Sequence, residues 1–580
     1  MAALGVYASL GSSEALACTP YPPLNNATVT CSSTYWLGFA SSSSNLTITV
    51  NAASSFIQTS GGGGAAMLAN GGHLLLTVSG TIDPSGLTSM PVLTSGVIAG
   101  NGSASSIIIQ SDNNGIIRGT AGSPSAFLTT FAGMAIEVWN AAGGQTRINN
   151  AGLIEARDIS GLSTSTFADD KALIAIRGGG QVVMSNVASG RIIGRVAFER
   201  SSGLGHTFLN AGSIRGSVSM GAGGVNEFTA VTLSSLTGDG STTGSLGNSL
   251  GYNLTFAPTG QVDGGAGGIN TLKLRNPSSS GNSGAVTISA NQYVNFNYLE
   301  VNGGTWTING PLLGSATSST TLVNGTVVVD NSLVFGNGIV TANGGTLQSA
   351  DANVNLANAI SLTNTGLNVS GGDDLTLSGV ISGLSGTLRK GGAGNLTLTR
   401  INGYNGMTYL DAGTLTLGND QALGNSTLVV GGGTLAASTA VVVSNGISVS
   451  SPEMTVAGSN DIILTGLVSI GAKLLKDGTS NLTLGSSTIF SGGAELKSGT
   501  LTIGNGSAVG SGSLLVSGAS SLATGQSVTL ANTVTLNSNL TVTGNNDLQL
   551  DGVVSGSGKL IKTGTGTLTL NALNTHGGGV

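Results

Sequence analysis

The strongest constraint on the fold of this chain is a long internal repeat in its C-terminal half. Two sets of residues recur every 86 positions and a third recurs every 87: Lys390, Lys476 and Lys562; Leu398, Leu484 and Leu570; and Asn358, Asn445 and Asn532. The segment that starts at Gly413 returns at Gly499, and a more degenerate copy starts at Gly325. Repetition at a fixed period is typical of a fold that stacks one supersecondary unit on the next.

Each repeat contains short segments with the pattern of β-strands. In residues 413–417, Gly-Thr-Leu-Thr-Leu, polar and apolar side chains alternate, so that Leu faces one side of a strand and Thr the other. Gly-Asn and Gly-Gly pairs between such segments favour tight turns. No stretch shows a sustained 3.6-residue period with helix caps, so we predict little or no α-helix.

A β-solenoid explains these strands better than other all-β folds. A β-sandwich has no reason to repeat in this way. A transmembrane barrel needs strands of about 10 residues and girdles of aromatic side chains, whereas aromatic residues make up only 4% of this chain. An 86-residue unit divides into about four coils of roughly 20 residues, each with two or three short strands. We therefore predict an all-β parallel β-helix with ladders of inward-facing aliphatic side chains.

The N-terminal half repeats less regularly. Residues 150–154, Asn-Ala-Gly-Leu-Ile, are echoed at 210–214, but the looser echoes lie at uneven spacings. Uneven spacing predicts coils that carry inserted loops. Candidates for these loops are the Gly-rich stretches 61–64, 178–180 and 221–224.

Four parts of the chain are expected from these patterns. Residues 1–17 are the remnant of a signal peptide or a disordered tail, because Ala15-Leu16-Ala17 resembles a signal-peptidase site. Residues 18–45 form an N-terminal cap. Residues 46–260 form an irregular β-helix with loop insertions, and residues 261–580 form a regular β-helix that ends in mid-repeat.

The expected cap carries the two cysteines of the chain, Cys18 and Cys31. Two thiols this close together, in a chain poor in histidine and charge, predict one small disulfide loop, which stabilises by about 3 kcal/mol in the chain-entropy model. The segment also contains three prolines, which cannot donate a hydrogen bond to another strand. We expect it to cover the first coil with Trp36 and Phe39.

Composition argues against two classes of partner. The 19 basic residues are scattered and the first of them is Arg118, so the sequence lacks the basic patch that nucleic-acid binding needs. Mean hydropathy is positive, at +0.29, yet no apolar run approaches the ~18–20 residues of a membrane-spanning helix. We expect no nucleic-acid partner and no membrane-spanning segment.

The repeat core resembles the autotransporter-associated β-strand repeat found in passenger domains of type V secreted proteins. The matching residues are 390–398 (Lys-Gly-Gly-Ala-Gly-Asn-Leu-Thr-Leu), 402–406 (Asn-Gly-Tyr-Asn-Gly) and 412–418 (Ala-Gly-Thr-Leu-Thr-Leu-Gly), within a match that spans roughly 290–580. The resemblance implies a right-handed parallel β-helix on the surface of a Gram-negative bacterium or outside it. It also implies export through the periplasm and the outer membrane by a C-terminal β-barrel, which is absent from this sequence.

No catalytic motif can be assigned. Passengers that are serine proteases or esterases use Gly-Asp-Ser-Gly or Gly-Asp-Ser-Leu, and the nearest segment, Gly-Asp-Gly-Ser at 238–241, fits neither. A catalytic triad needs a histidine base. His73 and His206 have no acidic or cysteine neighbours at metal-binding spacing. We predict no catalytic residue, no cofactor and no metal site.

Two further residues are interpreted as structural because each occupies a position defined by the repeat. His576 lies 86 residues after Phe490 and 172 after Tyr404, so it fills a position that the repeat gives to a ring. Trp306 replaces a leucine in a copy of the Gly-Thr-Leu-Thr-Leu strand, so we expect it in the core.

Two pairs of carboxylates are of the kind that polysaccharide-cleaving β-helices use. Asp373-Asp374 belongs to the repeat, because Asp374 is echoed by Asp461 and Asp547, and we interpret it as a turn residue. Asp169-Asp170 lies in the irregular half, where we interpret it as the cap of a loop.

Repetition without catalytic residues favours an adhesin-like or stalk protein over an enzyme. Its expected partners are protein or glycan ligands on host or bacterial cell surfaces, which it would contact to mediate attachment or aggregation. The alternative hypothesis is a carbohydrate-active enzyme of the polysaccharide lyase or hydrolase type, with its carboxylate site at Asp169 and Asp170.

Overall fold

The computed structural model is built almost entirely from short β-strands that pair in parallel. It describes residues 18–33, 39–52, 54–56, 65–84, 95–121, 134–158, 174–200, 203–238, 240, 256–276, 285–314, 318–352, 354–485 and 488–580. The described residues contain one turn of 3-10 helix, η3 (Ala290–Gln292), and no α-helix. The prediction of an all-β parallel β-helix is therefore confirmed.

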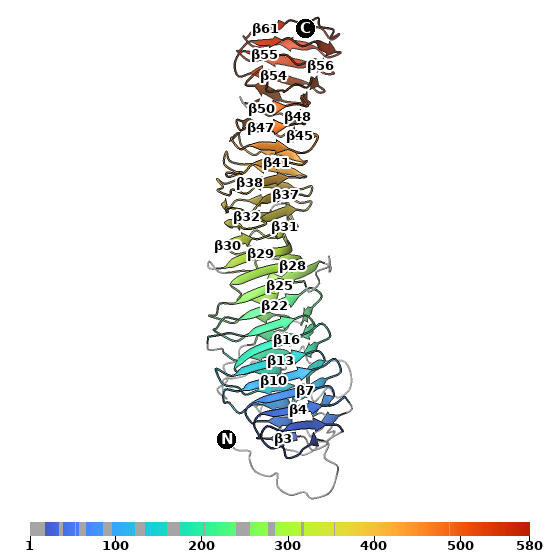
Figure 1. Cartoon of the computed structure of the whole chain (residues 1–580), viewed down its shortest axis with the longest axis vertical. Helices are drawn as coiled ribbons and strands as arrows, with labels where there is room; N and C mark the ends of the chain where they lie inside the picture. Colours follow the sequence, from blue (N-terminus) through green and yellow to red (C-terminus); the bar gives the residue numbers. More distant parts are fainter. Residues whose placement is uncertain are drawn as a thin grey trace. The chain divides into compact units, whose positions relative to one another are not determined.

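The chain divides into two compact units. Unit 1 comprises Met1–Leu272 and Asn291–Phe296, and unit 2 comprises Lys273–Ala290 and Asn297–Val580. The division falls inside strand β25 (Thr271–Arg275), close to the predicted boundary at 260/261. Within each unit the strands stack in chain order, as the colours and labels of Figure 1 show.

Unit 1 winds through three parallel sheets in turn. The first sheet contains β2 (Thr28–Cys31), β4 (Leu46–Val50), β7 (Leu74–Val78), β10 (Ser106–Ser111), β13 (Gln145–Asn150), β16 (Gln181–Asn186), β19 (Thr207–Asn210) and β22 (Glu227–Val231). The second contains β5 (Ser55–Phe56), β8 (Thr81–Ile82), β11 (Ile116–Ala121), β14 (Leu153–Asp158), β17 (Arg191–Ile193), β20 (Ser213–Arg215) and β23 (Ser235–Thr237). The third contains β3 (Phe39–Ser41), β6 (Ala65–Ala69), β9 (Ser95–Ala99), β12 (Ile136–Val138), β15 (Ile174–Gly178), β18 (Arg195–Phe198), β21 (Val218–Ser219), β24 (Val262–Asp263) and β27 (Tyr293–Val294).

Alternating side chains fill the interior of unit 1. In β4 the buried residues are Leu46, Ile48 and Val50, and the two threonines between them point outward. Deeper in the unit, rings stack from coil to coil, with centroid distances of 5.3 Å between Phe208 and Phe228 and 6.0 Å between Phe228 and Tyr293. The core is therefore a set of side-chain ladders that run across the coils.

A ladder of buried asparagines accounts for the echo at 150–154 and 210–214. The Nδ2 of Asn150 donates to the Oδ1 of Asn186 over 2.8 Å, and Asn186 donates to Asn210 over the same distance. The sequence does not reveal Asn186 as a member, because Val-Ala-Ser-Gly follows it in place of Ala-Gly.

Unit 2 has three faces that the chain visits in a fixed order. Face 1 consists of β26 (Val286–Ser289), the C-terminal halves of β28 (Tyr298–Asn309) and β29 (Ser319–Val329), β31 (Thr346–Ser349), β34 (Leu367–Ser370), β37 (Leu388–Lys390), β39 (Thr408–Leu410), β41 (Leu428–Val430), β44 (Ile447–Val449), β47 (Val468–Ile470) and β50 (Thr488–Phe490). In the later coils, the position of face 1 in chain order is occupied by β55 (Val528–Leu530), β58 (Leu548–Leu550) and β61 (Leu568–Leu570).

Face 2 consists of β32 (Val354–Leu356), β35 (Leu375–Leu377), β38 (Asn395–Leu398), β40 (Thr414–Leu417), β42 (Thr434–Ala437), β45 (Glu453–Val456), β48 (Lys473–Lys476), β51 (Ala494–Leu496), β53 (Leu514–Val516), β56 (Val534–Leu536) and β59 (Val554–Gly556). Face 3 consists of the N-terminal halves of β28 and β29, β30 (Ile339–Ala342), β33 (Ile360–Leu362), β36 (Ile381–Ser382), β43 (Val441–Val443), β46 (Ile462–Leu464), β49 (Asn481–Leu484), β52 (Thr500–Ile503), β54 (Ser520–Thr524), β57 (Leu540–Thr543) and β60 (Leu560–Lys562).

The 86-residue repeat does not equal a whole number of coils. On face 1 the register partners of successive coils run from Lys390 through Leu410, Val430 and Val449 to Ile470, so four coils take 80 residues. The repeat partner of Lys390 is Lys476, which lies six residues further on and therefore on face 2. The same step carries Lys562 to face 3.

The expected division of the repeat into about four coils thus needs a correction. One repeat takes four coils and about a third of the next, so each copy of a motif lies on the face that follows the face of the previous copy. The three copies of the Gly-Thr-Leu-Thr-Leu type obey this rule, in β29 on face 1, β40 on face 2 and β52 on face 3.

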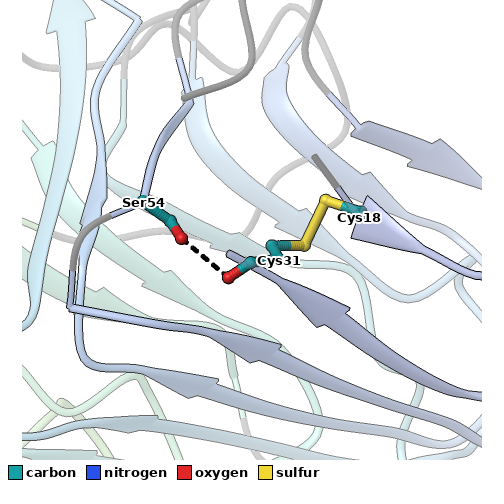
Figure 2. Close-up of a disulfide and its surroundings, with 3 residues drawn as sticks. All are labelled: Cys18, Cys31 and Ser54. Carbon is teal, nitrogen blue, oxygen red and sulfur yellow. Dashed lines mark hydrogen bonds between the residues drawn. A yellow bond between two sulfur atoms is a disulfide. The ribbon is translucent and has the colours of Figure 1, made fainter. Parts of the chain in front are cut away.

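The N-terminal segment closes the first coil of unit 1 through a short antiparallel strand. The strand β1 (Cys18–Thr19) pairs with β2, and Cys18 is opposite Cys31, to which it is joined by a disulfide. Figure 2 shows this bond beside Ser54, whose hydroxyl donates to the carbonyl of Cys31 over 2.7 Å. Phe39 is buried against Tyr21, with ring centroids 5.7 Å apart, whereas Trp36 lies outside the described residues.

Candidate functional site

One corner of unit 1 receives its long insertions. Between the described strands of this unit, the four longest connections are residues 83–94, 122–135, 159–173 and 238–261, and each leads from a second-sheet strand to a third-sheet strand. Of these residues the structure describes only 83–84, 134–135, 238, 240 and 256–261. The strands before the insertions keep their pairing, since β11 and β14 match over six residues, whereas the register of β15 against β18 shifts between Ile174 and Ile176. We call this corner the insertion corner.

One of the Gly-rich stretches proposed as loops is a tight turn instead. Gly179 and Gly180 join β15 to β16 directly, whereas 221–224 lies in the seven-residue connection from β21 to β22, as a loop would. Gly180 has a φ of 72°, and an added Cβ there would lie 2.7 Å from the carbonyl oxygen of Gly144. Glycine is needed at this position because the backbone is left-handed and crowded. The stretch 61–64 lies outside the described residues.

A cluster of charged side chains lies on the third sheet, toward the end at which its strands lead back to the first sheet. Arg177 on β15 makes an ion pair with Glu137 on β12, at 3.7 Å, and a second, closer pair with Glu199, which follows β18. The guanidinium carbon of Arg177 lies 3.9 Å from the ring centroid of Trp139. One arginine therefore bridges two carboxylates and stacks on an indole.

Burial perturbs the groups of this cluster. Arg177 is 2% exposed and Glu137 is 5% exposed. Burial raises the pKa of Glu137 above its ordinary value, and the charge of Arg177 opposes that shift. The strands β12, β15 and β18 are buried on both faces, unlike the half-exposed strands of the first sheet, so their outer side is covered.

His206 and Arg195 extend the cluster. The Nδ1 of His206 accepts the backbone N–H of Val182 at 3.0 Å, and its Nε2 lies 2.8 Å from the carbonyl oxygen of Glu199. These partners place the single ring proton on Nε2 and make the imidazole neutral. Burial lowers the pKa of His206, which also favours the neutral form. Arg195 is buried at the start of β18, near the ring of Phe256.

The second sheet contributes a further ion network, on strands that lead into the insertion corner. Glu155 on β14 accepts the Nε of Arg118 over 2.8 Å and the Nε of Arg157 over 3.0 Å. Arg118 also reaches Asp83, the first residue after β8, at 3.0 Å. Charged residues are only 8% of the chain, so these two networks on adjacent sheets distinguish this part of unit 1.

This arrangement supplies a protonatable carboxyl, a fixed cation and a neutral imidazole within one cluster. Those groups are the components of acid–base chemistry on a glycan or of recognition of a charged ligand. Their burial keeps Glu137, Arg177 and His206 from direct contact with a polymer in this structure. Two charges that flank these groups are part-exposed: Glu199, after β18, has 27% of its side chain exposed, and Arg157, at the insertion corner, has 28% exposed.

In unit 2 the repeated lysines bind backbone carbonyls. The Nζ of Lys390 donates to the carbonyls of Gly391, Gly392 and Ala412, at 2.8, 2.9 and 3.1 Å. Lys476 makes the same three contacts, with Asp477, Gly478 and Ser498. In each case two acceptors lie in the turn after the lysine and the third lies in the next coil.

These lysines are buried, and their environment shifts their acidity. Burial lowers the pKa of Lys476 to about 8, against the opposing charges of Asp477 and Asp461. Burial lowers the pKa of Lys390 as well. Lys476 therefore remains an ammonium at neutral pH, and each of its three N–H groups has an acceptor.

The repeated aspartates and asparagines also bind the backbone of a neighbouring coil. Asp374, Asp461 and Asp547 each accept one backbone N–H, from Asn395, Asn481 and Thr567. The Nδ2 of Asn445 donates to the carbonyls of Gly424 and Ser426 in the coil before. The polar residues of the repeat are thus used to join one coil to the next.

The other residues singled out in the sequence occupy structural positions or lie outside the described residues. Trp306 is buried, and Tyr404 is buried with its hydroxyl 2.7 Å from the Oγ1 of Thr408. His73 is exposed, and its Nδ1 accepts the N–H of Ser106. Asp169 and Asp170, the side chain of Phe490, and residues 239 and 241 of the Gly-Asp-Gly-Ser segment lie outside the described residues.

Sequence reasoning missed the charged cluster on the third sheet. Glu137, Arg177 and Glu199 are far apart in the sequence, and insertions of unequal length conceal their common register. One signal was available: strands 174–178 and 195–198 each carry an arginine in an otherwise apolar run. An arginine in such a run predicts a partner on the neighbouring strand.

Comparisons with protein-family models, with curated proteins and with solved structures find no match. Among the described residues, no three His, Cys, Asp or Glu side chains lie close enough together to hold a metal ion. In the same part of the chain no helix is long and apolar enough to cross a membrane.

Proposed function

We propose that this chain is the surface-displayed or secreted passenger of an autotransporter and that it acts as an adhesin-like protein on a stalk. Unit 2 would be the stalk, and the insertion corner of unit 1 would carry the binding surface. The partners would be protein or glycan ligands on host or bacterial cells. The bond that joins Cys18 to Cys31 is in keeping with an oxidising compartment outside the cytoplasm.

The observation that carries the stalk assignment is the use of the polar repeat residues in unit 2. Lys390, Asn445 and Asp461 all bind backbone groups, so these residues are engaged within the fold and are not presented to a ligand. The one-third step of the repeat also moves each motif to a new face. No face of unit 2 therefore carries the same motif at every repeat, as a repeated docking surface would require.

The binding surface is assigned to the insertion corner because the length of the connections varies there and because the ion network around Glu155 lies on the strands that lead into it. The second-sheet strands before the insertions keep their register, since β11 and β14 match over six residues. Arg157, near the end of β14, is the more exposed of the two arginines that bind Glu155 at this corner, with 28% of its side chain exposed.

Binding of the purified chain to cultured host cells and to Gram-negative cells tests the proposal. We expect saturable binding that is retained when Lys497 of unit 2 is changed to Ala and is reduced at least fivefold by Arg157→Ala. Equal loss with the unit 2 control would contradict the assignment to the insertion corner. Absence of binding to any surface would leave a spacer without adhesive function.

A carbohydrate-active enzyme is the second candidate, and one observation favours it. Glu137 and Glu199 share Arg177, and the pKa of Glu137 is raised, as in pairs of carboxylates that act as acid and base. The test is release of reducing ends or unsaturated products from acidic polysaccharides. Activity that Glu137→Gln or the double change Asp169→Asn with Asp170→Asn abolishes would replace the adhesin proposal.

A further inference from the structure

Each repeat of unit 2 contains one turn that interrupts the regular strands. Consecutive turn residues occur at 332–337, 420–425 and 506–511. Each turn starts from an asparagine whose Oδ1 accepts the N–H two residues on, namely Asn331, Asn419 and Asn505. Most other coils in this region have short strands or simple corners in its place.

A second asparagine, in the coil that follows, donates two hydrogen bonds to this turn. Asn358 donates its Nδ2 to the carbonyls of Gly336 and Gly338, at 2.9 and 2.8 Å. The corresponding pair of acceptors is Gly424 and Ser426 for Asn445, and Gly510 and Gly512 for Asn532. Asn358 and Asn532 are buried, and Asn445 is half-buried.

The strands of unit 2 do not by themselves determine which coil stacks on which. Successive strands on face 2 are nearly the same, for example Asn-Leu-Thr-Leu at 395–398 and Thr-Leu-Thr-Leu at 414–417, and they are paired residue for residue. A coil that stacked one coil too early would still place leucine on leucine. Strands with nearly identical sequences specify their register weakly.

We infer that Asn358, Asn445 and Asn532 are register-determining residues, each of which selects the one coil on which its own coil stacks. The turn that supplies two carbonyls to Nδ2 occurs once in a repeat, so only one register satisfies both acceptors. In any other register the amide loses these partners, and an unpaired amide in a buried site is unfavourable. A single polar side chain is known to fix register in the same way in coiled coils.

The test traps the register with engineered cysteine pairs in the full chain. Val429 on β41 is the register partner of Ser448 on β44, and Tyr409 on β39 is the partner of Val429 one coil earlier. The pair Val429→Cys with Ser448→Cys reports the native register. The pair Tyr409→Cys with Ser448→Cys reports a slip by one coil. Each protein is refolded from urea under reducing conditions, oxidised and analysed by peptide mass spectrometry.

We expect the native cross-link alone when Asn445 is present. Asn445→Ala, and Asn445→Asp, which keeps the size but lacks the N–H donors, should raise the slipped cross-link at least tenfold. The matched control is Asn425→Ala in the same turn, because Asn425 is exposed and bonds only at the surface, to the side chain of Asn405. This control should give no slipped cross-link.

Two outcomes would overturn the inference. If the Asn445 variants form the native cross-link without the slipped one, then Asn445 does not select the register. If they lose both cross-links, then Asn445 stabilises the coil without choosing its neighbour.

Discussion

The buried lysines of unit 2 are the residues whose role is easiest to isolate. Lys390 places an ammonium where three carbonyls converge, one of them from the next coil. Lys562 occupies the equivalent place on face 3, where its Nζ donates to the carbonyls of Thr563 and Gly564. Lys497 of the same unit is exposed and therefore provides a comparison with a lysine outside these turns.

We predict that Lys390→Met lowers the free energy of unfolding of unit 2 by about 2–4 kcal/mol, because it leaves buried carbonyls without donors. Lys497→Met should cost less than about 1 kcal/mol, because Lys497 is exposed. Urea unfolding followed by circular dichroism measures both. Equal effects of the two changes would show that the buried hydrogen bonds contribute little.

His206 makes the free energy of unfolding of unit 1 depend on pH. Burial keeps its pKa below the ordinary value of 6.5, whereas the imidazole titrates near that value in the unfolded chain. Below pH 6.5 the unfolded chain therefore binds more protons than the folded chain, and the free energy of unfolding falls as the pH falls. Protonation of Nδ1 would also break the bond from Val182.

We predict that the urea midpoint of unit 1 decreases between pH 7.5 and pH 5, and that His206→Asn removes a measurable part of this decrease. Asparagine keeps an acceptor for the N–H of Val182 but does not titrate. His73→Asn is the control, because His73 is exposed. A pH dependence unchanged by His206→Asn would assign the acid effect to other groups.

At the scale of single elements, β1 has a role out of proportion to its two residues. It pairs with the outer edge of β2, and the Cys18–Cys31 disulfide holds it there. An open strand edge invites pairing with another chain. The cap therefore both ends the sheet and protects it.

Cys18→Ser combined with Cys31→Ser should increase hydrogen exchange in β2 and β4 and promote end-to-end association, while unit 2 keeps its β signal. Loss of a disulfide that closes a loop of this size costs about 3 kcal/mol. Ser54→Ala is the matched control, because it removes the hydrogen bond to Cys31 and leaves the disulfide. Uniform destabilisation of both units would contradict a local role.

The sequence was sufficient to predict the strands of unit 2 wherever polar and apolar residues alternate strictly. Leu396, Leu415 and Leu435 alternate with threonine or alanine, and all three are buried in register on face 2. The charged cluster was not predicted, because Glu137 and Arg177 come together only when insertions of unequal length are aligned. The lysine sites were also missed, because spacing alone does not reveal that Lys390 points inward.

For unit 2 as a whole, the fractional step of the repeat has a consequence that deletion can test. Removal of 391–476 takes out one full repeat of 86 residues, joins Lys390 to Asp477 and restores the local sequence of the lysine turn. Each later strand would then occupy the preceding face. Because the three faces have the same kind of inward ladder, the coils should still stack.

We predict that this shortened chain keeps its circular dichroism per residue and resists protease as the parent does. The control removes 391–473, which is three residues fewer and places Leu474 where the turn requires Gly391. It should lose protease resistance in unit 2. Greater resistance of the control than of the full-repeat deletion would contradict the equivalence of the faces.

The insertion corner also bears on how such a protein changes over generations. Strands β11 and β14 remain matched residue for residue although 122–135 and 159–173 follow them, so sequence added after either strand leaves their hydrogen bonds intact. Mutation can lengthen, shorten or replace what lies there while the scaffold keeps its stability. For protein engineering, the corner after β14 is therefore the preferred place to graft a foreign peptide for display.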